Sequence, residues 1–291
     1  MHPKYGEIVK RLKAWAEQES KVHSALILGS QVREEFEGDE WSDLDVLLLV
    51  DDPQVFLQTD TWLAFFGEAV CGTVEETQLD WIRLNWAVKR VLFADNRTVD
   101  FSILPYDRLD DILSINAAIH AHGYQIIYDD CSNRLDAKIE ATLKHVDVAV
   151  PEIPSEDKLH QAVNDLLFQL IFACKKIKRK ELWVAVSCIN QEISRRLLDL
   201  IEFHTASIGI VPQYICYDGR FLEQRTRPDI LEQLTHCFAK YNGPDAVQTA
   251  GHILNTAHYL TKDICEVNHY PFDDYPFDKI RKLFRDMFEN A

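Results

Sequence analysis

The sequence has no long apolar run and no apolar signal core. No stretch among its 291 residues is apolar for long enough to cross a bilayer, and the segment 1–20 is charged throughout. We therefore expect a cytoplasmic protein and neither a secreted nor a membrane-embedded one.

Paired cysteines are also missing. The odd number of cysteines and the absence of any C-x-x-C fit neither a disulfide framework nor a zinc site. We expect reduced thiols in the core. The seven cysteines are Cys71, Cys131, Cys174, Cys188, Cys216, Cys237 and Cys265.

Basic residues are few: 31 Lys and Arg stand against 47 Asp and Glu, which gives a formal net charge of −16. An acidic surface repels nucleic acid and anionic membranes and attracts cationic solutes. We expect no nucleic-acid or membrane partner. Whether the acidity serves solubility or a cationic substrate stays open. The chain is expected to be a monomer or a homodimer.

Apolar residues make up 47% of the chain, enough for the cores of two modest domains. Up to residue 150 strand and helix patterns mix, and beyond it nearly every segment has helical period. A proline-containing stretch at 151–155 marks the change. The predicted class is α+β: a mixed sheet with flanking helices in domain 1–150 and an all-α bundle in domain 151–291.

The expected elements follow from these patterns. Helices are predicted over 5–20, 53–69, 157–177, 181–204, 228–241, 245–268 and 277–289. Strands are predicted over 25–28, 43–50, 86–93, 98–104 and 125–128, with a hairpin turn at 94–97.

Two carboxylates open the predicted strand 43–50. Since side chains alternate along a strand, Asp43 and Asp45 point the same way while Leu44 and Val46 point into the core. Unpaired carboxylates are costly there, and a hard divalent cation such as Mg²⁺ would satisfy them. Without further evidence, two solvent-exposed acids at the start of a strand are a better interpretation of this pair than a metal site.

The residues upstream change that balance. An apolar run ends at Gly29-Ser30, where a glycine lets the backbone approach a ligand, and a following helix would offer N–H groups to a phosphate. A third acid, Asp100, lies on the strand 98–104, on the face opposite to Val99 and Phe101. If that strand lies beside 43–50, all three carboxylates reach the same metals, and Asp100 is a ligand, a general base or both.

The motif GSQVREEFEGDEWSDLDV at 29–46, followed by VDFSILP at 99–105, resembles the DNA-polymerase-β-like nucleotidyltransferase superfamily. Within it the chain is most similar to the aminoglycoside 6-adenylyltransferase (streptomycin adenylyltransferase) family. The resemblance extends over most of the chain, through segments 164–204, GRFLEQ at 219–224 and 256–287.

This resemblance implies a Mg²⁺-dependent transfer of AMP from ATP to a hydroxyl of a cationic aminoglycoside-like acceptor, with release of pyrophosphate. It also implies a polymerase-β-like nucleotidyltransferase catalytic domain (1–150) and a helical substrate-binding domain (151–291), with the substrate in the cleft between them. Asp43, Asp45 and Asp100 match the metal ligands, and Gly29 and Ser30 match the phosphate turn.

Two departures from the family pattern stand out. The family usually has Arg after Gly-Ser where this chain has Gln31, so Arg33 is the predicted replacement for nucleotide binding. Asp165 stands where the family tends to have Glu, and it is predicted to contact the acceptor or act as an auxiliary base.

Alternative functions remain at this point. The same chemistry could act on a protein hydroxyl or another metabolite, or the chain could be a catalytically silent nucleotide-binding protein. The presence of all three acids, Asp43, Asp45 and Asp100, argues against a catalytically inactive protein. Trp86 and Trp183 are expected in the core.

Overall fold

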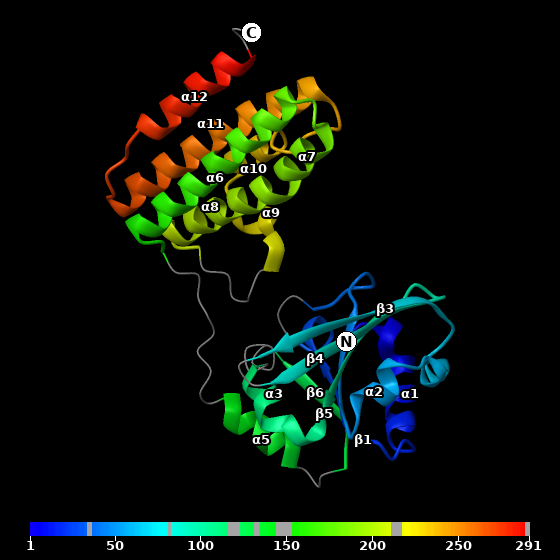
Figure 1. Cartoon of the computed structure of the whole chain (residues 1–291). Coiled ribbons are helices and arrows are strands. Elements are labelled where there is room, and N and C mark those ends of the chain that lie inside the picture. Colours follow the sequence, from blue (N-terminus) through cyan, green and yellow to red (C-terminus); the bar gives the residue numbers. More distant parts are fainter. Residues whose placement is uncertain are drawn as a thin grey trace. The chain divides into compact units, whose positions relative to one another are not determined.

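The computed structural model describes residues 1–33, 37–80, 83–115, 123–130, 134–143, 153–210 and 217–288. It divides the chain into two units, Met1–Val148 and Ala149–Ala291. The predicted boundary near residue 150 falls on 144–152, outside the described residues. The first unit mixes strands and helices, and the second has helices and no strand among its described residues (Figure 1), so the predicted α+β class is confirmed.

The first unit holds six strands and the helices around them. In chain order its elements are η1 (Pro3–Tyr5), α1 (Gly6–Ala16), β1 (Val22–Leu28), η2 (Gly29–Gln31), β2 (Leu44–Val50), α2 (Pro53–Leu57), η3 (Thr61–Phe65), β3 (Ala69–Leu79), β4 (Leu84–Phe93), β5 (Thr98–Pro105), η4 (Tyr106–Arg108), α3 (Leu109–Ile115), β6 (Tyr124–Asp129) and α5 (Arg134–Leu143).

The strand order in the sheet is β3-β4-β5-β2-β1-β6. The pair β2–β5 is parallel and the other neighbouring pairs are antiparallel. The predicted turn at 94–97 joins β4 and β5, with Asn96 in the left-handed region at φ 63°. Asn tolerates that conformation better than most residues, which suits the tight hairpin.

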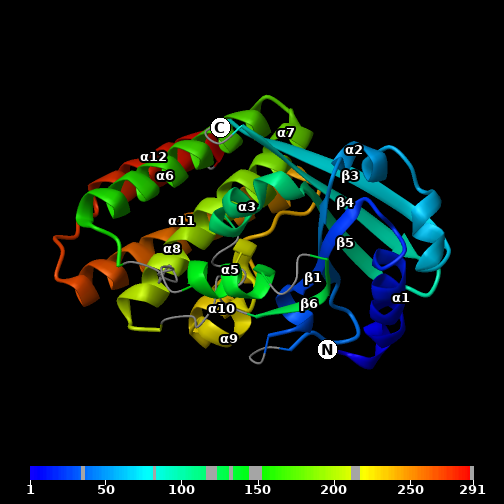
Figure 2. The ribbon, with the colours of Figure 1, turned by 90° about the horizontal axis from the view of Figure 1, so that it is seen from below.

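Helices cover both faces of the sheet: α1 and α2 lie on one side and α3 and α5 on the other (Figure 2). On the first face Trp15 of α1 packs in one cluster with Phe56 and Phe101. On the second face Ile112 of α3 packs in one cluster with Leu47 of β2. Because they are buried on both faces, segments 25–28 of β1 and 46–50 of β2 are continuous apolar runs.

The predicted helix over 53–69 is wrong beyond Leu57, although it begins at Pro53 as expected. α2 ends at Leu57, and β3 begins at Ala69 and pairs with β4. The ammonium group of Lys89, on β4, donates to the carbonyl oxygens of Phe56, Leu57 and Thr59. These tertiary hydrogen bonds use the carbonyls that a continuing helix would need, so the helix stops.

Strand β3 was not predicted, because it has no alternating pattern of burial. It is an edge strand, and its residues are exposed along almost its whole length. Pairing with β4, and not the burial of one face, holds it in place. α3 and α5 were not predicted either.

The second unit is a helical bundle. Its elements are α6 (Glu156–Lys178), α7 (Leu182–Ser187), the π-helical segment η5 (Cys188–Ile193), α8 (Ser194–Ser207), η6 (Tyr217–Gly219), α9 (Leu222–Arg225), α10 (Pro228–Leu234), α11 (Gly243–Asn268) and α12 (Tyr275–Phe288). The helices α6, α8 and α11 enclose one core, and α12 packs on α6 and α11.

The long helices over 157–177 and 245–268 are confirmed, and the helix over 181–204 is present with a π-helical segment in it. The helix over 228–241 is wrong beyond Leu234. There the side chain of Asn190 bonds both the N–H and the carbonyl of Ala239, at 2.8 Å each, and replaces helical hydrogen bonds. The predicted end of the last helix, Glu289, lies outside the described residues.

Among the described helices, none has the length and apolar character needed to cross a membrane. Cys174, Cys188, Cys237 and Cys265 are free and buried as expected. Cys71 is exposed on β3, so its assignment to the core is wrong. Cys131 and Cys216 lie outside the described residues.

Candidate active site

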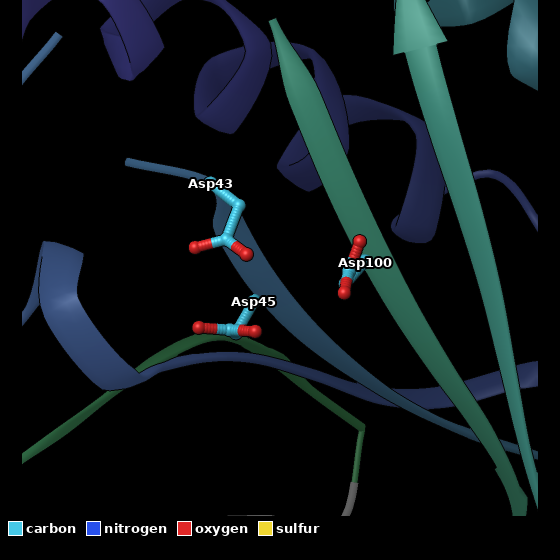
Figure 3. A group of neighbouring side chains, drawn as sticks. All are labelled: Asp43, Asp45 and Asp100. Atoms are coloured by element: carbon cyan, nitrogen blue, oxygen red, sulfur yellow. The ribbon is translucent and has the colours of Figure 1, made fainter. Parts of the chain in front are cut away.

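Three carboxylates meet where β2 and β5 run side by side. Asp45 is the register partner of Asp100, and Asp43 comes just before β2. Leu44 and Val46 turn into the core, as strand alternation requires. Oxygen atoms of all three carboxylates lie within 4.8 Å of one another, on one side of the two strands (Figure 3). We call Asp43, Asp45 and Asp100 the carboxylate cluster.

The residues of the cluster fit a divalent cation. Burial raises the pKa of Asp100; the charge of Arg90 lowers it, and those of Asp43 and Glu75 raise it further. The Oδ1 atom of Asp100 is buried and has no hydrogen-bond partner in the described structure. A desolvated oxygen beside two other carboxylates is satisfied by a hard cation with oxygen ligands, such as Mg²⁺.

The turn after β1 brings backbone against this cluster. Gly29 has φ 69°, in the left-handed region that favours glycine. A Cβ atom at this position would lie 2.5 Å from Oδ2 of Asp45. Glycine is therefore required for both the conformation of the turn and its close approach to the carboxylate.

Ser30 and Gln31 are buried within the same turn, at 5% and 1% exposure. The Oε1 atom of Gln31 accepts a hydrogen bond from the backbone N–H of His2 at 3.0 Å, which ties the N-terminal segment to the turn. The Ser30 hydroxyl and Nε2 of Gln31 have no partner among the described residues. Arg33 follows the turn and is partly buried.

A cation on β4 touches the cluster. Nε of Arg90 lies 3.1 Å from Oδ2 of Asp100, and Nη2 of Arg90 lies 3.3 Å from Oε2 of Glu75 on β3. Sequence reasoning missed both residues. The predicted turn at 94–97 did not supply the signal, because counting outward from it pairs residue 91 with residue 100, whereas the observed register pairs Arg90 with Asp100.

A sequence model of the streptomycin adenylyltransferase family matches residues 4–287, almost the whole chain. The chain belongs to this family. It is a nucleotidyltransferase, and the carboxylate cluster lies within the matched region.

Individual relatives are distant. The aminoglycoside 6-adenylyltransferase of Bacillus subtilis (strain 168) is 21% identical over 195 residues, 66% of each chain. That of Campylobacter jejuni is 20% identical over 271 residues, 89% of this chain and 88% of the relative. A crystal structure of an aminoglycoside 6-adenyltransferase from Bacillus subtilis covers 97% of both chains with a TM-score of 0.46 and 16% identity.

The structure brings together part of the predicted set. Asp43, Asp45 and Asp100 form the cluster, and Gly29 abuts Asp45. Asp165 belongs to the second unit, on the exposed surface of α6, and is not a member of the cluster.

Exposed aromatic side chains in the second unit were not anticipated. Phe168 and Phe172, three and seven residues after Asp165 on α6, are 72% and 39% exposed. Trp183 is 72% exposed and lies edge-on to Tyr241, so its assignment to the core is wrong. Helical period alone does not show which face of a helix stays uncovered.

Proposed function

We propose that this chain transfers AMP from ATP to a hydroxyl of a cationic, aminoglycoside-like small molecule and releases pyrophosphate, with Mg²⁺ held by Asp43, Asp45 and Asp100. The observation that carries the proposal is the convergence of these three carboxylates within 4.8 Å in a chain of this family. Relatives from several bacteria are named aminoglycoside 6-adenylyltransferase, which supports the choice of acceptor.

In the proposed reaction the acceptor oxygen forms a bond to the α-phosphorus of ATP. The bond from that phosphorus to the bridging oxygen of pyrophosphate breaks, and pyrophosphate leaves. Asp100 takes the proton of the acceptor hydroxyl, because an alcohol is a weak nucleophile without a neighbouring base. Bound Mg²⁺ supplies stabilisation of the charge on the phosphates.

The turn after β1 is the proposed phosphate site. Gly29 allows close approach of the backbone, the buried Ser30 hydroxyl is available as a donor, and Arg33 adds a positive charge next to the turn. Gln31 is fully buried and bonded to His2, so it serves the shape of the turn in this proposal.

The second unit is proposed to recognise the acceptor. Asp165 is an exposed carboxylate on α6, and carboxylates pair with the ammonium groups of a polycationic acceptor. The formal net charge of −16 favours the approach of such a molecule.

Mass spectrometry tests the proposal directly. The protein is incubated with ATP, Mg²⁺ and a panel of aminoglycosides, and Asp45→Asn serves as the inactive control. The expected result is an aminoglycoside that gains the mass of AMP with wild type alone. AMP found on a protein or on another metabolite would contradict the proposed acceptor, and ATP left intact with every acceptor would contradict the proposed activity.

A further inference from the structure

A row of side chains crosses the sheet at the carboxylate cluster. Asp45 on β2 is the register partner of Asp100 on β5, and Asp100 is in turn the partner of Arg90 on β4. On the far side of Arg90, Glu75 of β3 holds the other end of the guanidinium at 3.3 Å. Arg90 is therefore anchored from both neighbouring strands.

The two oxygens of Asp100 have different surroundings. Oδ2 lies 3.1 Å from Nε of Arg90, while Oδ1 is buried without a partner in the described structure. The terminal torsion of an aspartate is broad and nearly two-fold, so an unrestrained carboxylate exchanges its two oxygens freely. Contact with a planar, anchored guanidinium removes that freedom.

We propose that Arg90 is a positioning residue for the metal site: it holds Oδ2 of Asp100 so that Oδ1 is presented to the cation. The inference rests on the metal site of the proposed function. Side chains that hold a metal ligand in place commonly contribute about 10–100-fold to metal affinity, and Arg90 has the contacts for this role.

A role through charge alone predicts the opposite result. A positive charge next to a cation site weakens cation binding, so its removal would strengthen binding. Arg90→Gln removes the charge and the anchored contact together, whereas Arg90→Lys keeps the charge and loses the planar fork that reaches both carboxylates. Comparing the two variants therefore shows whether Arg90 acts by holding the Asp100 carboxylate in place or only by its positive charge.

The test is the affinity for Mn²⁺, measured by electron paramagnetic resonance on the protein without nucleotide. We expect both Arg90→Lys and Arg90→Gln to weaken Mn²⁺ binding about 10–100-fold. Arg11→Lys is the matched control, since the side chain of Arg11 is also 48% exposed and also paired with a carboxylate, that of Glu7. It should bind Mn²⁺ as wild type does.

The outcomes separate this inference from the proposed function. Wild type without measurable Mn²⁺ binding would overturn the metal site itself. Wild-type affinity in Arg90→Lys together with tighter binding in Arg90→Gln would overturn the positioning role and leave the metal site standing. Thermal unfolding of the metal-free variants shows whether they are folded.

A second measurement needs no variant. In wild type the nitrogen chemical shift of Arg90 Nε should change little when Mg²⁺ is added, because the ion pair with Asp100 persists. A large change toward the shift of a free arginine side chain would show that the cation displaces Arg90, and would also overturn the inference.

Discussion

Asp100 has surroundings of its own within the carboxylate cluster. Its side chain is 16% exposed, Arg90 engages one oxygen, and the other oxygen is buried without a partner in the described structure. Asp43 and Asp45 come from a different strand, β2 and the residue before it. In the proposed site Oδ1 of Asp100 helps to hold the cation, and the same carboxylate takes the proton of the acceptor hydroxyl, so a substitution of Asp100 should affect both binding and rate.

Asp100→Asn should reduce kcat by about two to four orders of magnitude and should also weaken the binding of ATP in Mg²⁺, because Asp100 is both the proposed base and a ligand of the proposed metal site. An amide cannot accept the acceptor's proton, and a general base usually contributes on this scale. Single-turnover kinetics and calorimetric titration of ATP measure the two quantities. Asp45→Asn is the comparison and should weaken ATP binding in Mg²⁺. Unchanged ATP affinity in Mg²⁺ for Asp100→Asn would contradict its place among the metal ligands, and an unchanged kcat would contradict its role as the base.

At the scale of elements, the sheet is held at the end opposite to the carboxylate cluster by a histidine between two acids. His23 lies on β1, and its ring nitrogens lie 2.7 Å from Oδ1 of Asp51, just after β2, and 2.9 Å from Oδ2 of Asp130, just after β6. Burial alone would lower the pKa of His23, but its hydrogen bonds to Asp51 and Asp130 and their charges outweigh burial and raise it above 6.5.

This pair of contacts predicts how stability depends on pH. Because the pKa of His23 is higher in the folded than in the unfolded protein, its stabilisation is fully present below about pH 6.5. It is lost as the pH rises through the folded pKa. The free energy of unfolding is measured in urea for wild type and for His23→Gln, from below about pH 6.5 to above the folded pKa of His23. Wild type should be the more stable protein at low pH, and its advantage should shrink as the pH rises. A difference independent of pH would contradict the prediction.

Neighbouring residues of β4 serve different purposes because they face opposite sides of the sheet. Arg90 faces the carboxylate cluster, whereas Lys89 is buried at 5% exposure and holds the end of α2. Its ammonium group also pairs with Asp60 at 2.5 Å. One strand thus contacts both the carboxylate cluster and the end of a helix.

Lys89→Met should lower the free energy of unfolding by about 1–3 kcal/mol, because buried carbonyl groups lose their donor. Mn²⁺ affinity should not change, since the side chain points away from the cluster. Denaturant titration and paramagnetic resonance measure the two effects. Arg90→Lys should give the reverse pattern, and Mn²⁺ binding lost together with stability in Lys89→Met would contradict the separation of the two faces.

At the scale of the whole molecule, net charge influences which charged solutes approach. The formal net charge is −16, so a long-range field favours cationic acceptors. From the sequence alone, this acidity could serve solubility or the binding of a cationic substrate. The acidic surface matches the charge of the aminoglycoside-like acceptor that we propose.

Acceptor affinity should therefore fall as ionic strength rises, because salt shortens the reach of the field from about 30 Å at 0.01 M to about 8 Å at 0.15 M. Calorimetric titration of the acceptor over this range measures the effect. Asp165→Asn should bind the acceptor more weakly and show a smaller salt dependence. Acceptor affinity indifferent to salt would count against recognition by carboxylates.

The sequence by itself determined the alternation of side chains at the site. The two-residue period of a strand places Asp43 and Asp45 together, and it places Asp100 opposite to Val99 and Phe101, whatever the neighbouring strands are. Short continuous apolar runs predicted β1 and β2, because both faces of these strands are buried. The helical period of the apolar residues predicted α6 and α11, because one face of each long helix is buried. The residues of the proposed phosphate turn could be identified from the local sequence in the same way.

Tertiary structure alone decided which strands are neighbours and which surfaces stay uncovered. Local sequence does not state that β2 lies parallel to β5, and it is this pairing that brings Asp45 to Asp100. Lys89 ends α2 through contacts more than thirty residues away in the chain, and Trp183 is exposed because no helix packs over it among the described residues. Such outcomes depend on long-range contacts, for which short-range periodicity carries no signal.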